Sequence, residues 1–68
     1  MSELSLLTDR QYLVLMGLIN GYSSVQIAQA LGVTFGAVEQ TWQRIARVAG
    51  CRNLALITRW AIRNGVNP

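Results

Sequence analysis

The segment 23–47, SSVQIAQALGVTFGAVEQTWQRIAR, constrains the fold more than any other part of the chain. Apolar residues recur with helical spacing over 24–31 and again over 35–49, and a glycine, Gly32, separates the two runs. Because Gly32 adopts a positive φ at little cost, we expect a tight turn there. Thr34 has a hydroxyl that can cap the second run. The segment therefore predicts two short helices joined by a turn.

The second of these helices has two chemically different sides. Val38, Trp42 and Ile45 recur at spacings of four and three, which places them on one apolar stripe and assigns Trp42 to the core. The opposite side is polar, and its residues are Glu39, Gln40, Gln43, Arg44 and Arg47. A short apolar helix, a glycine turn and a helix with a polar outer side form a helix-turn-helix pattern, which is typical of proteins that read DNA.

Local signals place two further helices around this segment. Capping boxes begin at Thr8 and at Ser23, each with a glutamine three residues later. Asn53 can cap a last helix that Gly65 ends. The predicted helices are 9–20, 24–31, 35–49 and 54–64, with 1–6 as a loose tail or an apolar strap and 66–68 as a short tail. No strand pattern occurs, so we expect an all-α, four-helix bundle that forms one domain over 1–68.

The composition favours a chain that meets a partner. Hydrophobic residues make up 51% and charged residues 13% of 68 residues, which is apolar for a domain whose core is necessarily small. The six basic residues are all arginine, and three acids leave a net charge of +3. A basic balance fits nucleic acid, and arginine also suits protein interfaces.

Catalytic, metal and membrane signals are weak in this sequence. There is no histidine, and the carboxylates Glu3, Asp9 and Glu39 fall on a tail, a helix cap and a helix face. The single cysteine, Cys51, excludes an internal disulfide and a cysteine-based zinc site. We therefore expect no enzyme activity, cofactor or metal. No apolar stretch approaches a membrane span and no signal peptide is present, so a cytoplasmic protein is expected.

A longer set of residues carries a family resemblance. The set is Leu7-Thr8-Asp9-Arg10, Val14-Leu15, Gly21-Tyr22-Ser23, Ile27-Ala28, Leu31-Gly32-Val33-Thr34, Val38, Ile45, Gly50, Arg52-Asn53 and Ala61. In order and spacing, without a gap from Leu7 to Val66, the chain resembles the LuxR-type (GerE-like) helix-turn-helix domain. That domain is the DNA-binding module of many bacterial response regulators and quorum-sensing activators. The resemblance implies that the third helix enters the major groove and that the fourth makes a two-fold dimer contact.

The resemblance also implies a set of DNA-binding residues. Position by position, Glu39, Gln40 and Gln43 would face bases, where glutamine can read adenine and glutamate can accept from cytosine. The places that would face phosphate are Thr34, Ala37, Arg44 and Arg47, with Ser23 or Ser24 at the start of the helix before the turn. Phe35 has two open roles, contact with a thymine methyl or packing back on the turn, and packing is slightly favoured.

The last helix is apolar on two sides, which predicts that it is buried on two sides. Leu54, Ile57 and Ala61 lie on one side. A dimer or partner interface is predicted on the other, with the residues Leu56, Arg59, Trp60 and Arg63.

The leading hypothesis is a bacterial transcription regulator that binds double-stranded DNA as a homodimer and associates with the nucleoid when bound. The alternative is an anti-activator, a protein-interaction module that pairs with a larger LuxR-type regulator. The alternative is motivated by the apolar content, the absence of lysine and the acid Glu39 on the polar side. The chain is either a stand-alone regulator or one domain of a longer protein.

Overall fold

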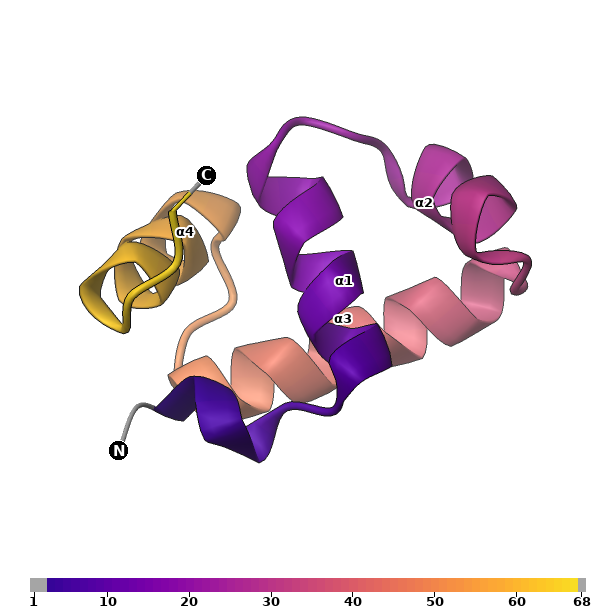
Figure 1. Cartoon of the computed structure of the whole chain (residues 1–68). Helices are drawn as coiled ribbons and strands as arrows, with labels where there is room; N and C mark the ends of the chain where they lie inside the picture. The colour runs from indigo at the N-terminus through magenta and orange to yellow at the C-terminus, as the bar shows by residue number, and fades with distance from the viewer. Residues whose placement is uncertain (1–2, 68) are drawn as a thin grey trace.

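The computed structural model describes residues 3–67, and its regular elements are all helical (Figure 1). In chain order they are the 3₁₀ turn η1 (Glu3–Leu6) and the helices α1 (Asp9–Ile19), α2 (Ser24–Leu31), α3 (Phe35–Ala49) and α4 (Leu54–Arg63). No strand occurs within the described range. The all-α, four-helix prediction is confirmed, and every α-helix begins where the sequence predicts. None of these helices has the length and apolar character needed to cross a bilayer.

The longest helix, α3, is the element on which the others pack. Figure 1 shows α3 along one side of the molecule, with α1 crossing it and with α2 and α4 on opposite sides of α1. The helices α1, α2 and α4 and the turn η1 all contact α3. One side of α3 is therefore covered by the rest of the chain, and its other side is left to solvent.

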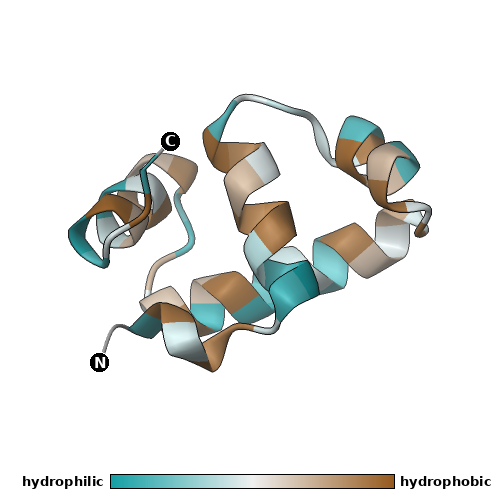
Figure 2. Ribbon diagram, viewed as in Figure 1, coloured by the Kyte–Doolittle hydropathy of each residue, from teal (hydrophilic) through white to brown (hydrophobic). Residues whose placement is uncertain are grey.

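The core forms where the apolar sides of the helices meet. Figure 2 shows that hydrophobic and hydrophilic residues alternate along these helices. Its buried residues are Val14, Leu15, Ile27, Ala28, Val38, Ile45, Ala46, Ile57, Trp60, Ala61 and Val66. Val38 and Ile45 of α3 are completely buried. Trp42 packs against this core and is half-buried, which agrees with the predicted stripe.

Local hydrogen bonds explain why the helices begin at these residues. The Thr8 hydroxyl accepts from the Gln11 N–H at 3.2 Å, and the Gln11 side chain accepts from the Thr8 N–H at 2.9 Å. Ser23 and Gln26 make the same pair of bonds at 3.1 and 2.9 Å. Both predicted capping boxes are confirmed, and each satisfies backbone N–H groups that a helix start leaves without partners.

The two ends of the chain close over the core. At the N-terminus, Leu4 in η1 and Leu7 after it pack against the core, whereas Leu6 is 67% exposed. At the C-terminus, Val66 is 4% exposed and its N–H donates to the Ala61 carbonyl at 3.0 Å. Val66 follows the end of α4, as the predicted short tail does, and it packs into the core. Residues 1, 2 and 68 lie outside the described range.

Candidate nucleic-acid interface

The segment between α2 and α3 fixes the position of α3 relative to α2. Gly32 ends α2 in the left-handed conformation, with φ 68° and ψ 33°, which glycine adopts without a Cβ penalty. The N–H of Val33 then donates to the Ala28 carbonyl at 3.0 Å. Thr34 is extended, and its hydroxyl accepts from the Ala37 N–H at 3.1 Å. Two residues therefore separate the end of α2 from the cap of α3, and the predicted tight turn is confirmed.

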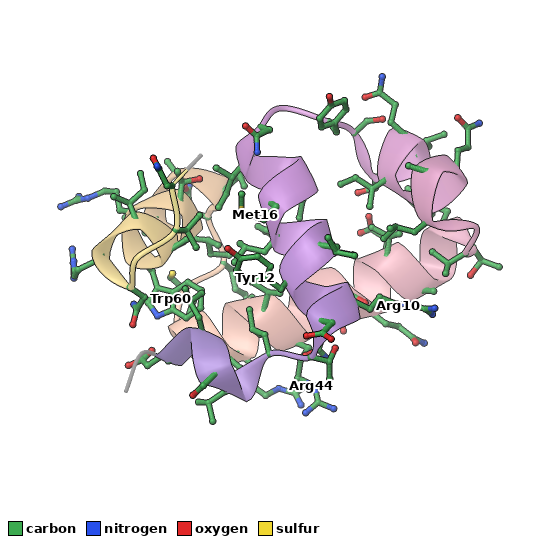
Figure 3. The ribbon with its side chains drawn as sticks, viewed as in Figure 1. Arg10, Tyr12, Met16, Arg44 and Trp60 are labelled. Atoms are coloured by element: carbon green, nitrogen blue, oxygen red, sulfur yellow. The ribbon has the colours of Figure 1, made fainter. Side chains whose placement is uncertain are left out.

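A polar stripe runs along the solvent side of α3. Its members are Gln40, Gln43, Arg44 and Arg47, which are all exposed and which we call the α3 polar face. Spacings of three, four and seven residues put them on one side of a helix. Figure 3 shows Arg44 extending away from the bundle. Because the opposite side of α3 is buried, this face cannot turn inward without loss of the core.

The chemistry and size of the α3 polar face suit a groove of duplex DNA. Its two amides carry both donors and acceptors, and its two guanidinium groups carry donors only. No exposed residue of α3 has a carboxylate. From Gln40 to Arg47 the helix rises by roughly 10 Å, close to the roughly 12 Å width of the major groove. The face can therefore combine base-edge contacts with phosphate contacts.

Glu39 lies beside the α3 polar face rather than on it. This side chain is half-buried, whereas its neighbour Gln40 is exposed. A shallow depression of about 150 Å³ is lined by Leu18, Ser24, Glu39, Trp42 and Leu54. The prediction that Glu39 shares the exposed polar side is corrected, because one residue along a helix turns the side chain by roughly 100°. The exposed stripe is consequently more basic than the sequence predicted.

The start of α3 offers an aromatic ring and a hydroxyl to solvent. Phe35 is 52% exposed, so packing back on the turn would cover only part of its ring. Its ring is free to meet an apolar group such as a thymine methyl. Thr34 and Ser23 are exposed N-caps whose oxygens accept from backbone N–H groups. Each hydroxyl proton can still be donated to an outside acceptor.

The predicted interface on α4 is divided by the fold. Leu54, which the sequence predicts on the buried side, is 43% exposed at the first position of the helix. Leu56, Arg59 and Arg63 are exposed, as an interface requires. Trp60, in contrast, is only 9% exposed, and its indole N–H donates to the Glu3 carboxylate at 2.7 Å. Figure 3 shows the ring between α4 and the N-terminal segment. Trp60 thus belongs mainly to the core of its own chain, because η1 covers it.

An apolar hollow between α1 and α2 was not predicted from the sequence. It measures about 200 Å³, and its lining residues are Leu13, Gly17, Tyr22, Gln26, Ile27, Ala30 and Leu31. Leu13 and Gly17 are four residues apart on α1, away from the core stripe, and that spacing was the available signal. Among residues 3–67, no group of histidine, cysteine and acidic side chains is arranged to hold a metal ion.

Two helices joined by a tight turn at Gly32, with a polar exposed side on the second helix, define a helix-turn-helix domain. The GerE family model, which describes bacterial regulatory proteins of the luxR family, matches residues 5–61, and the chain belongs to that family. Membership indicates DNA-binding regulation of transcription and confirms the resemblance read from the sequence. Comparison with curated proteins and with solved structures gave no match.

Proposed function

We propose that the chain regulates transcription by placing the α3 polar face in the major groove of duplex DNA. One observation carries this proposal: Gln40, Gln43, Arg44 and Arg47 are exposed together on a helix whose other side is buried. The helix is held by its core, so its orientation in a groove is fixed by α1 and α2. This arrangement agrees with the docking geometry of helix-turn-helix proteins.

Two of the four side chains can read the base sequence, and the other two can contribute affinity. Gln40 and Gln43 can each make a bidentate contact to an adenine edge. Arg44 and Arg47 can bind phosphates and release counterions, which makes the affinity dependent on salt. The hydroxyls of Ser23 and Thr34 stand at the starts of α2 and α3, where phosphate groups are favoured by the helix dipoles. Phe35 adds an apolar contact at the same end of α3.

A salt titration of DNA binding tests the proposal. The purified chain is titrated against a promoter-length duplex at several salt concentrations, with Arg47→Ala compared with the unchanged protein. If Arg47 binds one phosphate, the negative slope of log affinity against log salt becomes less steep by about 0.9 in Arg47→Ala. Arg52→Ala is the matched control, because Arg52 is exposed but lies outside α3. If Arg47→Ala and Arg52→Ala lost the same DNA affinity and salt dependence, the α3 polar face would not be the binding surface.

The homodimer predicted from the sequence is not part of this proposal. Pairing two copies through α4 would bring together helices that each carry Arg59 and Arg63, and α4 itself has no acid. The same observation favours a second candidate function, an interaction module that pairs with another protein, such as a larger regulator of the family. Co-purification with such a regulator, without any DNA shift by the small chain alone, would support the second function over the first.

A further inference from the structure

The shallow depression beside the α3 polar face is built by residues from all four α-helices. Its lining residues are Leu18 of α1, Ser24 of α2, Glu39 and Trp42 of α3, and Leu54 of α4. Leu18 and Trp42 pack against the core, so the fold holds this apolar wall in place. Ser24 and Glu39 are half-buried and provide a hydroxyl and a carboxylate. The depression therefore combines one negative charge with an apolar wall.

The Glu39 carboxylate has no counter-ion within the described part of the chain. Among the residues that line the depression, only Glu39 is charged. Its carboxylate takes part in no hydrogen bond or ion pair with residues 3–67, although Arg44 and Arg52 lie near the lining residues in sequence. Both arginines are exposed. A half-buried carboxylate loses part of its hydration, and that loss favours a cation from outside the chain.

The indole ring of Trp42 adds a second attraction for a cation. The face of a tryptophan ring attracts an ammonium group that lies within roughly 6 Å of it. Glu39 and Trp42 are three residues apart on α3, and side chains at this spacing are neighbours on a helix surface. An ammonium group on the carboxylate can therefore also approach the indole. Any alkyl part attached to it can lie on Leu18 and Leu54.

The size of the depression limits what it can hold. Its volume is about 150 Å³. A cavity of roughly that volume binds benzene, whereas sites for drug-sized ligands measure roughly 300–1,000 Å³. The depression is therefore too small for a nucleotide or a large cofactor, and it has room for a short alkyl chain with one charged end.

We propose that this depression binds a small organic amine in its protonated form, with a linear chain of about four carbons. The ammonium group donates to the Glu39 carboxylate and to the Ser24 hydroxyl oxygen, and the alkyl chain covers the apolar wall. The site lies beside the α3 polar face and shares no residue with it. Its occupation can therefore be measured without DNA and does not depend on the proposed function.

The test follows the indole N–H signals of the ¹⁵N-labelled protein by nuclear magnetic resonance. The probe is n-butylammonium chloride at constant ionic strength, and 1-butanol is its neutral analogue. Glu39→Gln removes the charge and keeps the shape of the side chain. Asp9→Asn is the matched control, because it removes an exposed carboxylate at the start of α1, outside the depression. Trp60 lines another hollow, so its indole signal is an internal control.

We expect n-butylammonium to shift the Trp42 signal with saturation, at a dissociation constant of about 1–10 mM for so small a ligand. Glu39→Gln should weaken binding about fivefold, which corresponds to the loss of one partly exposed charge pair. Asp9→Asn should change binding by less than about twofold, because surface charges at a distance are screened. The neutral alcohol should bind the unchanged protein about as weakly as n-butylammonium binds Glu39→Gln.

Four results would overturn the proposal. The first is a Trp42 signal that does not saturate, and the second is an equal loss in Glu39→Gln and Asp9→Asn, which would indicate unspecific attraction. The third is equal binding of 1-butanol and n-butylammonium, which would show that the charge has no role. This comparison needs no variant and stays decisive if Glu39→Gln alters the fold. The fourth is tighter binding of Nα-acetyllysine methylamide, which would assign the depression to a lysine side chain of a protein partner.

Discussion

The Trp60 indole N–H donates to the Glu3 carboxylate at 2.7 Å, although 57 positions of sequence separate the two residues. A second bond, from the Glu3 N–H to the Asn64 side chain, ties the same residue to the end of α4. The N-terminal strap therefore fixes the last helix as well as covering it. In a domain of this size, one such connection between chain ends contributes a noticeable share of the stability.

Replacing Trp60 with phenylalanine should lower the free energy of unfolding, partly because the smaller ring leaves a cavity and partly, by about 1 kcal/mol, because a hydrogen bond is lost. Phenylalanine keeps a buried ring but has no N–H to donate, and a typical hydrogen bond contributes about that amount. Urea unfolding of Trp60→Phe, Glu3→Ala and the double variant measures the coupling. Strictly additive losses would show that the bond contributes nothing, since residues in contact are expected to be non-additive.

Adding a methyl group at Gly17 should destabilise the chain. A Cβ there would lie 2.9 Å from Cδ1 and Cγ1 of Ile27, where α1 approaches α2. Overpacking of this kind costs roughly 1–3 kcal/mol, which over most of that range exceeds the roughly 1 kcal/mol that alanine gains over glycine in a helix.

The matched control for this change is Gly36→Ala. The nearest atom to a Cβ at Gly36 is the Thr34 hydroxyl oxygen at 3.9 Å, an ordinary contact. Here only the helix propensity changes, so the variant should be up to about 1 kcal/mol more stable. Thermal unfolding of both variants shows whether each substitution raises or lowers the stability. A stabilised Gly17→Ala would contradict the close packing of α1 on α2.

Val66→Ala should cost about 2 kcal/mol, although Val66 comes only two residues before the end of the chain. Val66 is 4% exposed, and truncating a buried side chain removes its transfer free energy and leaves a cavity. Asn67→Ala is the control, since Asn67 is exposed and surface changes usually stay within about 0.5 kcal/mol. Chemical denaturation measures the free energy of unfolding of both variants. Equal values would show that Val66 is not packed in the core.

Gln43→Ala should reduce sequence discrimination more than affinity for bulk DNA. If its amide reads an adenine, the preference for the best site over a single-base variant of it should fall by about 1–3 kcal/mol. Gln29→Ala changes an exposed glutamine on α2 instead and should leave the preference unchanged. Competition binding between the best site and its single-base variant measures this preference. A preference retained in Gln43→Ala would show that another residue reads the base.

The limits of the helices could be predicted almost completely from the sequence. The caps at Thr8, Ser23, Thr34 and Asn53 all accept from nearby backbone N–H groups in the structure. Gly32 takes the positive φ that the turn needs. These features depend on residues within about four positions of one another. Such short-range hydrogen bonds can be predicted from the sequence because both partners are near neighbours in it.

The candidate site could be predicted only in part. The spacing of Gln40, Gln43, Arg44 and Arg47 predicted a common side, and the structure finds all four exposed. Periodicity did not separate Glu39 from them, because a residue at the edge of a helix face is exposed or covered according to its neighbours. Here Glu39 lines a depression with residues of α1, α2 and α4.

The sequence by itself determined where each helix starts, which side of α3 is apolar, and that a turn at Gly32 joins two helices. Only the tertiary structure decided which apolar side chains meet solvent. Trp60 is buried because η1 lies over it, whereas Phe35 and Leu56 stay exposed. The physical reason is that caps and turns are set by local hydrogen bonds, while burial depends on which distant segments pack together.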